Sequence, residues 1–136
     1  MLIAAAAFAV TGLIFLGLDV LWLTTMAPVY KRMIGEALVD PFRLTPAAIF
    51  YLLYVTGIVG FVVLPALQGG GWPAALAKGA FLGLVAYGTY DLSNQATLKI
   101  WPVSLTMMDM AWGVFLTSTT AALSTALLGR IFHNTL

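Results

Sequence analysis

Hydrophobic residues run through the chain in long stretches and do not alternate with polar residues. A helix that crosses a bilayer needs about 20 mainly apolar residues, whereas a transmembrane barrel needs strict alternation along each strand. The pattern therefore predicts helices. Four stretches are long enough to cross, at residues 2–23, 46–67, 73–95 and 103–128. We expect an all-α membrane protein, in which residues 1–136 form a single four-transmembrane-helix bundle.

Proline and glycine mark the ends of the middle spans. Thr45 can cap the second span, and Pro46 suits its first turn, where no backbone N–H is required. Pro65 is expected to end or kink this span. Residues 69–71, all glycine, then predict a tight turn before Pro73 starts the next helix.

The segment between the first two spans has its own helical pattern. We predict that it forms a short amphipathic helix on the membrane surface, starting at Pro28 and ending before Pro41. An ordered loop with solvated charges is the alternative. The apolar positions that would share one face of this helix are Tyr30, Met33, Ile34, Ala37 and Leu38.

Composition agrees with the membrane assignment. Hydrophobic residues make up 62% of the chain and charged residues only 8%, against about 25% charged in a typical soluble domain. This excludes a soluble enzyme and a nucleic-acid-binding protein, which needs a basic patch. The chain has no cysteine and a single histidine, His133. We therefore expect no disulfide, no haem held by paired histidines and no metal site or cofactor built on such residues.

The basic residues predict an orientation. Four of the six lie in the connections after the first and third spans, which an antiparallel bundle places on one side: Lys31, Arg32, Arg43 and Lys99. The other side has Lys78, within the third span, and Arg130. The positive-inside rule places the more basic side in the cytoplasm. We expect an integral protein of the bacterial inner membrane with both termini outside.

Three of the five acidic residues fall within predicted spans: Asp19, Asp91 and Asp109. Antiparallel threading brings these carboxylates to a similar depth near the cytoplasmic face. A carboxylate in hydrocarbon is unfavourable unless it is paired, hydrated or protonated, and three nearby negative charges repel one another. We expect at least one to be protonated, or a cation to lie between them. A divalent cation with Asn94 as a further ligand is compatible with these residues, although their spacing does not require one.

The residues around these carboxylates indicate an inward-facing site. On the third span small and polar residues recur every four positions, with Gly79 and Gly83 spaced for close helix contact. We expect a ligand-binding or proton-linked site made from Asp19, Asp91, Asn94, Asp109, Tyr51, Tyr54, Tyr87 and Trp112.

Other interpretations of the same residues stay open. A single intramembrane aspartate can simply join helices by hydrogen bonds. Aromatic residues near span ends are more often interfacial anchors than ligand contacts, and we assign that role to Trp72, Trp101 and Tyr30. The motif Asp-x-x-Trp occurs twice, beginning at Asp19 and Asp109, and Tyr-x-x-Tyr occurs twice between them, beginning at Tyr51 and Tyr87. This order is not that of a direct repeat.

One segment carries a family resemblance: residues 87–101, with the sequence YGTYDLSNQATLKIW. Together with DVLW at 19–22, PAAIFY at 46–51 and DMAWG at 109–113, it resembles a bacterial membrane family known as domain of unknown function family 2177. Ser93 stands where we expect threonine more often, and keeps the hydroxyl. The resemblance covers nearly the whole chain. It implies a small multi-span inner-membrane protein and supplies no activity or catalytic residues.

Three functions fit this sequence. The first is binding, or proton- or cation-linked transport, of a small amphipathic molecule in a pocket lined by carboxylates and aromatic residues. Transport by so short a chain would require a homodimer, and the face with Gly79 and Gly83 is one candidate contact. The second is a membrane-embedded enzyme acting on a lipid or isoprenoid, with Asp91 or Asp109 as general acid–base. The third is a non-catalytic partner subunit of a membrane complex.

Overall fold

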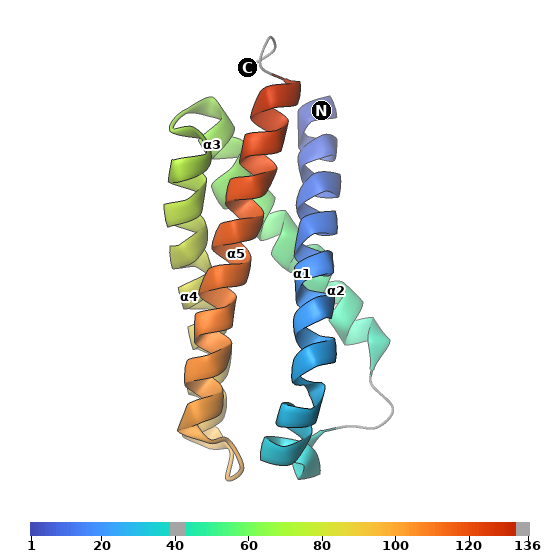
Figure 1. The fold of residues 1–136 in the computed structure, drawn as a ribbon, viewed down its shortest axis with the longest axis vertical. Coiled ribbons are helices and arrows are strands. Elements are labelled where there is room, and N and C mark those ends of the chain that lie inside the picture. Colours follow the sequence, from blue (N-terminus) through green and yellow to red (C-terminus); the bar gives the residue numbers. More distant parts are fainter. Residues whose placement is uncertain (39–42, 133–136) are drawn as a thin grey trace.

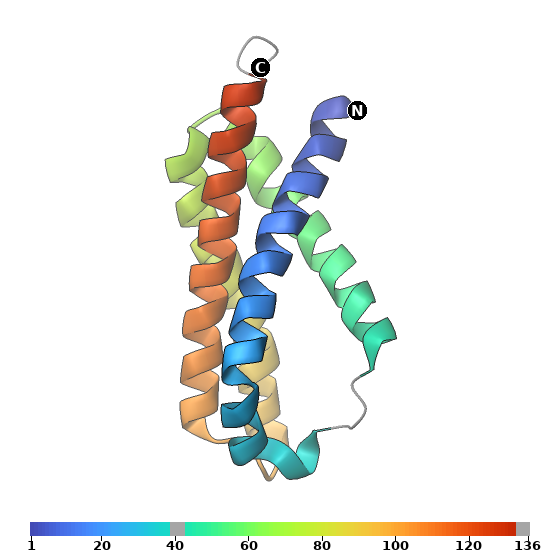
Figure 2. The same ribbon diagram turned by 45° about the vertical axis from the view of Figure 1, so that its right-hand side comes forward.

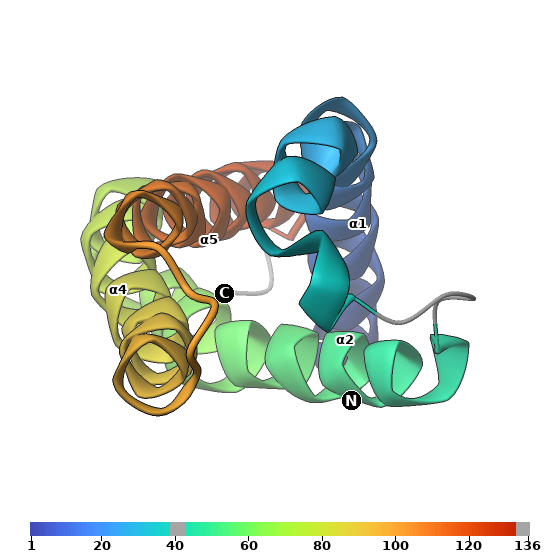
Figure 3. The same cartoon turned by 90° about the horizontal axis from the view of Figure 1, so that it is seen from below.

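The fold is a bundle of long helices. A computed structural model describes residues 1–38 and 43–132, and regular structure within them is helical throughout. Figure 1 shows α1, α4 and α5 running along the long axis, while α2 crosses obliquely, and Figure 3 shows the same arrangement from below. The all-α membrane fold is confirmed. The elements are α1 (Leu2–Ile34), η1 (Gly35–Ala37), α2 (Leu44–Ile58), η2 (Val59–Val63), α3 (Leu64–Gln68), α4 (Gly71–Thr97) and α5 (Val103–Ile131).

Three helical segments among the described residues are long and apolar enough to cross a membrane: Leu2–Ala37, Leu44–Gln68 and Val103–Ile131. The helix α4 has 27 residues, which is sufficient length, but it is not among the three. Its second half contains Asp91, Asn94 and Gln95 within five positions. The count of four spans therefore stays a prediction.

The surface helix expected between the first two spans is not a separate element. Instead, α1 continues through Pro28 to Ile34, and a short 3₁₀ turn follows at Gly35–Ala37. A proline inside a helix costs about 3 kcal/mol because it removes one hydrogen bond and crowds the preceding turn. Hydrogen bonds of Tyr30 with two other side chains, described below, favour the continued helix against this cost. The predicted end of the segment at Pro41 lies outside the described residues.

Pro65 widens its helix and does not end it. The N–H of Leu64 reaches back five residues to the carbonyl of Val59, so η2 is a π-helical turn. Regular α-helix resumes in α3 and continues to Gln68. The predicted turn of glycines follows, with φ of +88° at Gly70 and +57° at Gly71. These angles suit glycine because a side chain would be strained there.

The closest helix pair is α4 with α5. A Cβ atom added to Gly79 would lie 2.9 Å from the Cα of Ser118, and one added to Gly83 would lie 2.3 Å from the carbonyl oxygen of Gly113. Because Gly79 and Gly83 have no side chains, the backbones of α4 and α5 can touch at these positions. This corrects one expectation. The face with Gly79 and Gly83 is covered by α5 of the same chain and is not available as a homodimer contact.

The hydrophobic core lies where α1, η2 and α5 meet. Phe15, Ile58, Val63 and Leu116 are fully buried within it. Toward its start α2 leans away from the other helices, as Figure 2 shows. Met1 and the end of α5 lie at the same end of the bundle (Figure 1). The polar side chains of the candidate site occupy the part of the bundle beyond this core, toward the opposite end.

Candidate functional site

Asp19 joins three helices. Its carboxylate, on α1, is 6% exposed and accepts hydrogen bonds from the hydroxyl of Tyr51 on α2 and from the indole N–H of Trp112 on α5, the latter at 3.2 Å. Both donors are neutral groups. The structure therefore brings together three of the predicted site residues, and it gives this aspartate partners that leave its charge uncompensated.

Asp109 has a comparable arrangement on α5. It is 8% exposed and accepts a hydrogen bond from the hydroxyl of Tyr30 on α1. That hydroxyl in turn accepts one from the indole N–H of Trp22 at 2.9 Å. The donors thus form a short chain from Trp22 through Tyr30 to the carboxylate.

The two tryptophans join these arrangements into one network. The rings of Trp22 and Trp112 stack with their centroids 4.3 Å apart and their planes within 5°. Trp22 lies three residues after Asp19 on α1, and Trp112 three residues after Asp109 on the antiparallel α5. Each tryptophan therefore serves the carboxylate of the opposite helix, directly in one case and through Tyr30 in the other. The repeated Asp-x-x-Trp motif is explained by this exchange between helices.

Asp91 differs from the other two carboxylates. Its side chain, on α4, is 0% exposed, and neither carboxylate oxygen has a hydrogen-bond partner among the described residues. Asn94, which we expected beside it, interacts with Tyr90 instead. Asp91 lies near enough to Asp109 for their charges to interact. A charged carboxylate that is buried without a hydrogen-bond partner is strongly unfavourable, so this group needs a proton or a partner.

An aromatic cavity of about 290 Å³ lies between α2 and α4. Tyr54 and Tyr87 meet edge to face there, with ring centroids 6.2 Å apart. The hydroxyl of Tyr54 is fixed by a 2.8 Å hydrogen bond with Thr117 of α5. The cavity is lined by Phe50, Tyr54, Ala86, Tyr87 and Tyr90. Two predicted site residues, Tyr54 and Tyr87, therefore face this space.

Sequence reasoning missed Tyr30, Trp22, Phe50 and Tyr90. Tyr30 was expected to be an interfacial anchor, but its hydroxyl binds Asp109 inside the bundle. The signal was its spacing: Tyr30 lies eleven residues, or about three helical turns, after Asp19 and so shares its face. That spacing has meaning only if the helix continues through Pro28.

Residues 4–126 match the family described as a predicted membrane protein, DUF2177. The chain belongs to this family. The resemblance noted in the sequence is thereby confirmed, and the family description establishes a membrane protein without naming an activity. No curated protein and no solved structure matches the chain. The hydrogen-bonded network and the aromatic cavity are therefore the features of the molecule that bear on its function.

Proposed function

We propose that this membrane protein binds a small amphipathic molecule in the cavity between α2 and α4. Binding, or transport, is linked to the uptake or release of a proton or a cation by the nearby carboxylates. One observation carries the proposal. Asp91 is completely buried without a partner, one helical turn from Tyr87 and directly after Tyr90, and both tyrosines line the cavity.

The lining of the cavity supports a ligand with an apolar body. Its volume of about 290 Å³ is close to the lower limit of about 300 Å³ for small-molecule pockets. Four of its five lining residues are aromatic. Aromatic faces bind apolar groups and also attract cations. The cavity therefore suits a small amphipath, including one that carries a positive charge.

The charge balance supports a link to protons or cations. The hydrogen bonds to Asp19 and Asp109 come from tyrosine and tryptophan, none of which supplies a positive charge. Asp91 has no donor at all. Three carboxylates without a basic partner favour the arrival of a positive charge, whether it comes as a proton, a metal ion or a charged ligand.

The helices connect the cavity with the carboxylates. On α2, Tyr54 lines the cavity, and Tyr51, about one turn earlier, holds Asp19. On α4, Tyr87 lines the cavity one turn before Asp91. A ligand that separates Tyr54 from Tyr87 shifts α2 relative to α4. In our proposal this movement acts on the Tyr51–Asp19 hydrogen bond and on the surroundings of Asp91.

Binding of a defined probe tests this proposal. The purified protein is titrated with tetraphenylphosphonium, a small amphipathic cation, between pH 5 and 8, and the affinity is measured by calorimetry. We expect binding to strengthen as the pH rises, because proton and cation compete for the carboxylates. Asp91→Asn should weaken binding and flatten this pH dependence, and Tyr87→Ala should weaken binding at every pH.

Glu36→Gln is the matched control, because it removes a carboxylate from η1, outside the network. It should bind the probe as the wild type does. The proposal fails if Asp91→Asn and Asp109→Asn both keep the wild-type affinity and pH profile. It also fails if the wild type binds neither tetraphenylphosphonium nor N-phenylnaphthylamine, a fluorescent neutral amphipath.

A membrane-embedded enzyme acting on a lipid or isoprenoid is the second candidate. The observation that favours it is exposure at the cavity: Phe50 is 44% and Tyr90 58% exposed, so a lipid-borne substrate has lateral access between α2 and α4. Asp91 would then be the general acid–base. Lipid profiles of a deletion strain and an Asp91→Ala strain test this. Profiles identical to the wild type in both strains count against an enzyme.

We further propose that the protein lies in the bacterial inner membrane with both termini outside. Lys31 and Arg32 lie in the last turn of α1, and Lys99 lies between α4 and α5. Figure 1 shows the end of α1 and the connection from α4 to α5 at the end of the bundle opposite the N-terminus, and the positive-inside rule places that end in the cytoplasm. A reporter fused to the C-terminus, active only outside the cytoplasm, should be active. Activity of a cytoplasm-specific reporter at the same position would overturn the orientation.

A further inference from the structure

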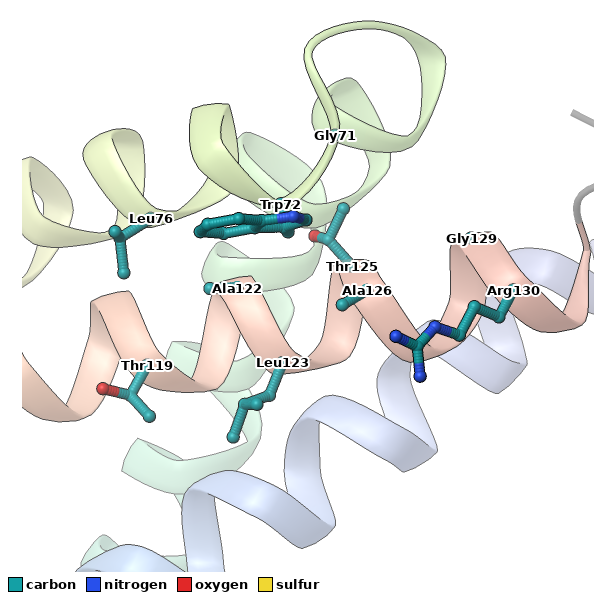
Figure 4. A pocket seen from close by; sticks show the side chains of 10 residues that line it. All are labelled: Gly71, Trp72, Leu76, Thr119, Ala122, Leu123, Thr125, Ala126, Gly129 and Arg130. Carbon is teal, nitrogen blue, oxygen red and sulfur yellow. The ribbon is translucent and has the colours of Figure 1, made fainter.

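A second hollow lies far from the aromatic cavity, at the end of the bundle where the termini meet. It is a groove of about 580 Å³ between α4 and α5, on the side of the bundle that Figure 4 shows. Small side chains of α5, including Ala122 and Ala126, form its floor. The indole of Trp72 and the side chain of Leu76 border it from α4.

The length of the groove matches one leaflet of a bilayer. Along α5 its lining extends from Thr119 to Arg130, which is about 16 Å at about 1.5 Å per residue. Half of a hydrocarbon core about 30 Å thick is about 15 Å. Trp72, 54% exposed, lies on α4 at the headgroup end, where tryptophan is enriched. The groove therefore extends from the interface to near the bilayer midplane.

The charge of the groove is positive at its outer end. Arg130, near the end of α5, is its only charged lining residue and is exposed. The acidic residues that the structure describes lie elsewhere: Asp19, Asp91 and Asp109 are buried inside the bundle, and Glu36 lies in η1, which follows the end of α1. A guanidinium group binds phosphate through paired hydrogen bonds. None of the described residues thus offers Arg130 a carboxylate, and its guanidinium group is suited to a phosphate.

We propose that this groove is a binding site for one anionic phospholipid. An acyl chain lies along the apolar floor at Ala122 and Ala126, and the phosphate group meets Arg130. Trp72 lies beside the acyl chain near the glycerol group of the lipid. This lipid site is separate from the aromatic cavity and does not depend on the function proposed for that cavity.

Lipid binding to the delipidated protein tests the proposal. Phosphatidylglycerol and phosphatidylcholine with identical acyl chains are titrated separately, and the bound lipids are counted by native mass spectrometry. The wild type should bind one phosphatidylglycerol more tightly than phosphatidylcholine. Arg130→Gln should weaken phosphatidylglycerol binding about fivefold, equivalent to about 1 kcal/mol, and leave phosphatidylcholine unchanged. Ala126→Leu, which fills the floor, should weaken both.

Lys99→Gln is the matched control, since it removes a basic residue at the opposite end of the bundle. It should not change this binding. Equal binding of the two lipids by the wild type overturns the proposal, as does a preference for phosphatidylglycerol that survives in Arg130→Gln. A second copy of the chain is the other occupant to test. Disulfide-linked dimers of Leu123→Cys that exclude lipid would show that the groove is a protein interface.

Discussion

Replacing Gly83 by alanine should push α4 away from α5. The added Cβ would lie 2.3 Å from the carbonyl oxygen of Gly113 and 2.8 Å from its carbon. Ordinary van der Waals contact begins at 3.4 Å, so the shorter contact must open by about 1.1 Å. A third contact, at 2.9 Å, is with the hydroxyl oxygen of Thr117. The two shortest contacts are with backbone atoms, so no change of side-chain rotamer relieves the clash.

The magnitude follows from two opposing effects. Overfilling a well-packed site costs about 1–3 kcal/mol, and a clash with backbone belongs at the upper end of that range. Alanine in a helix is more favourable than glycine by about 1 kcal/mol. We therefore expect Gly83→Ala to lower the free energy of unfolding by about 1–2 kcal/mol.

Gly17→Ala is the matched control on α1. A Cβ at Gly17 meets nothing within 4 Å, so this variant should be as stable as the wild type or more stable by up to about 1 kcal/mol. The free energy of unfolding can be measured in detergent by titration with dodecyl sulfate, followed by tryptophan fluorescence. Equal stability of the two variants would refute the close packing of α4 against α5.

Three further predictions concern the polar network. Asp91→Asn should not lower the free energy of unfolding, because Asp91 has no hydrogen-bond partner among the described residues to lose. Asp19→Asn should lower that free energy by about 1–3 kcal/mol, because it disturbs two hydrogen bonds. Thermal unfolding curves of the two variants test this contrast. Tyr54→Phe removes the hydrogen bond to Thr117 and should lower the same free energy by about 0.6 kcal/mol, the typical value between membrane helices, measured by the same titration. A double-mutant cycle on Trp22 and Trp112, each changed to leucine, should give a coupling of about 0.5–1.5 kcal/mol from their stacked rings, and additive effects would contradict the stacking.

The sequence predicted best where one physical rule acted alone. On α4, the small and polar residues that recur every four positions include Gly79, Gly83 and Asp91, and all three are buried, as helical periodicity predicted. The close contact made by Gly79 and Gly83 follows from their lack of side chains. The spacing of these residues did not reveal what packs against them, because another helix of the same chain and a helix of a second copy of the chain fit such a face equally well.

Prediction failed where tertiary contacts override a local rule. Pro28 predicts the start of a new helix, because a proline interrupts the hydrogen bonds of a helix. The structure shows that α1 continues through it. The contact that favours this continuation joins Tyr30 to Asp109, which lies 79 residues away. The same holds for Asp91. Its burial could be anticipated, but its lack of any partner depends on where Asn94 and its other neighbours point.

The exchange of tryptophans between α1 and α5 has a consequence for biogenesis. Asp19 lies on α1, which leaves the ribosome before α5, and its partner Trp112 lies on α5. Until α5 enters the bilayer, Asp19 lacks this donor, and Trp22 has no ring on which to stack. Sliding α1 along α5 by one turn, about 5.4 Å, would break these contacts together. The network is therefore complete only when α1 and α5 have both been inserted and lie in the correct register.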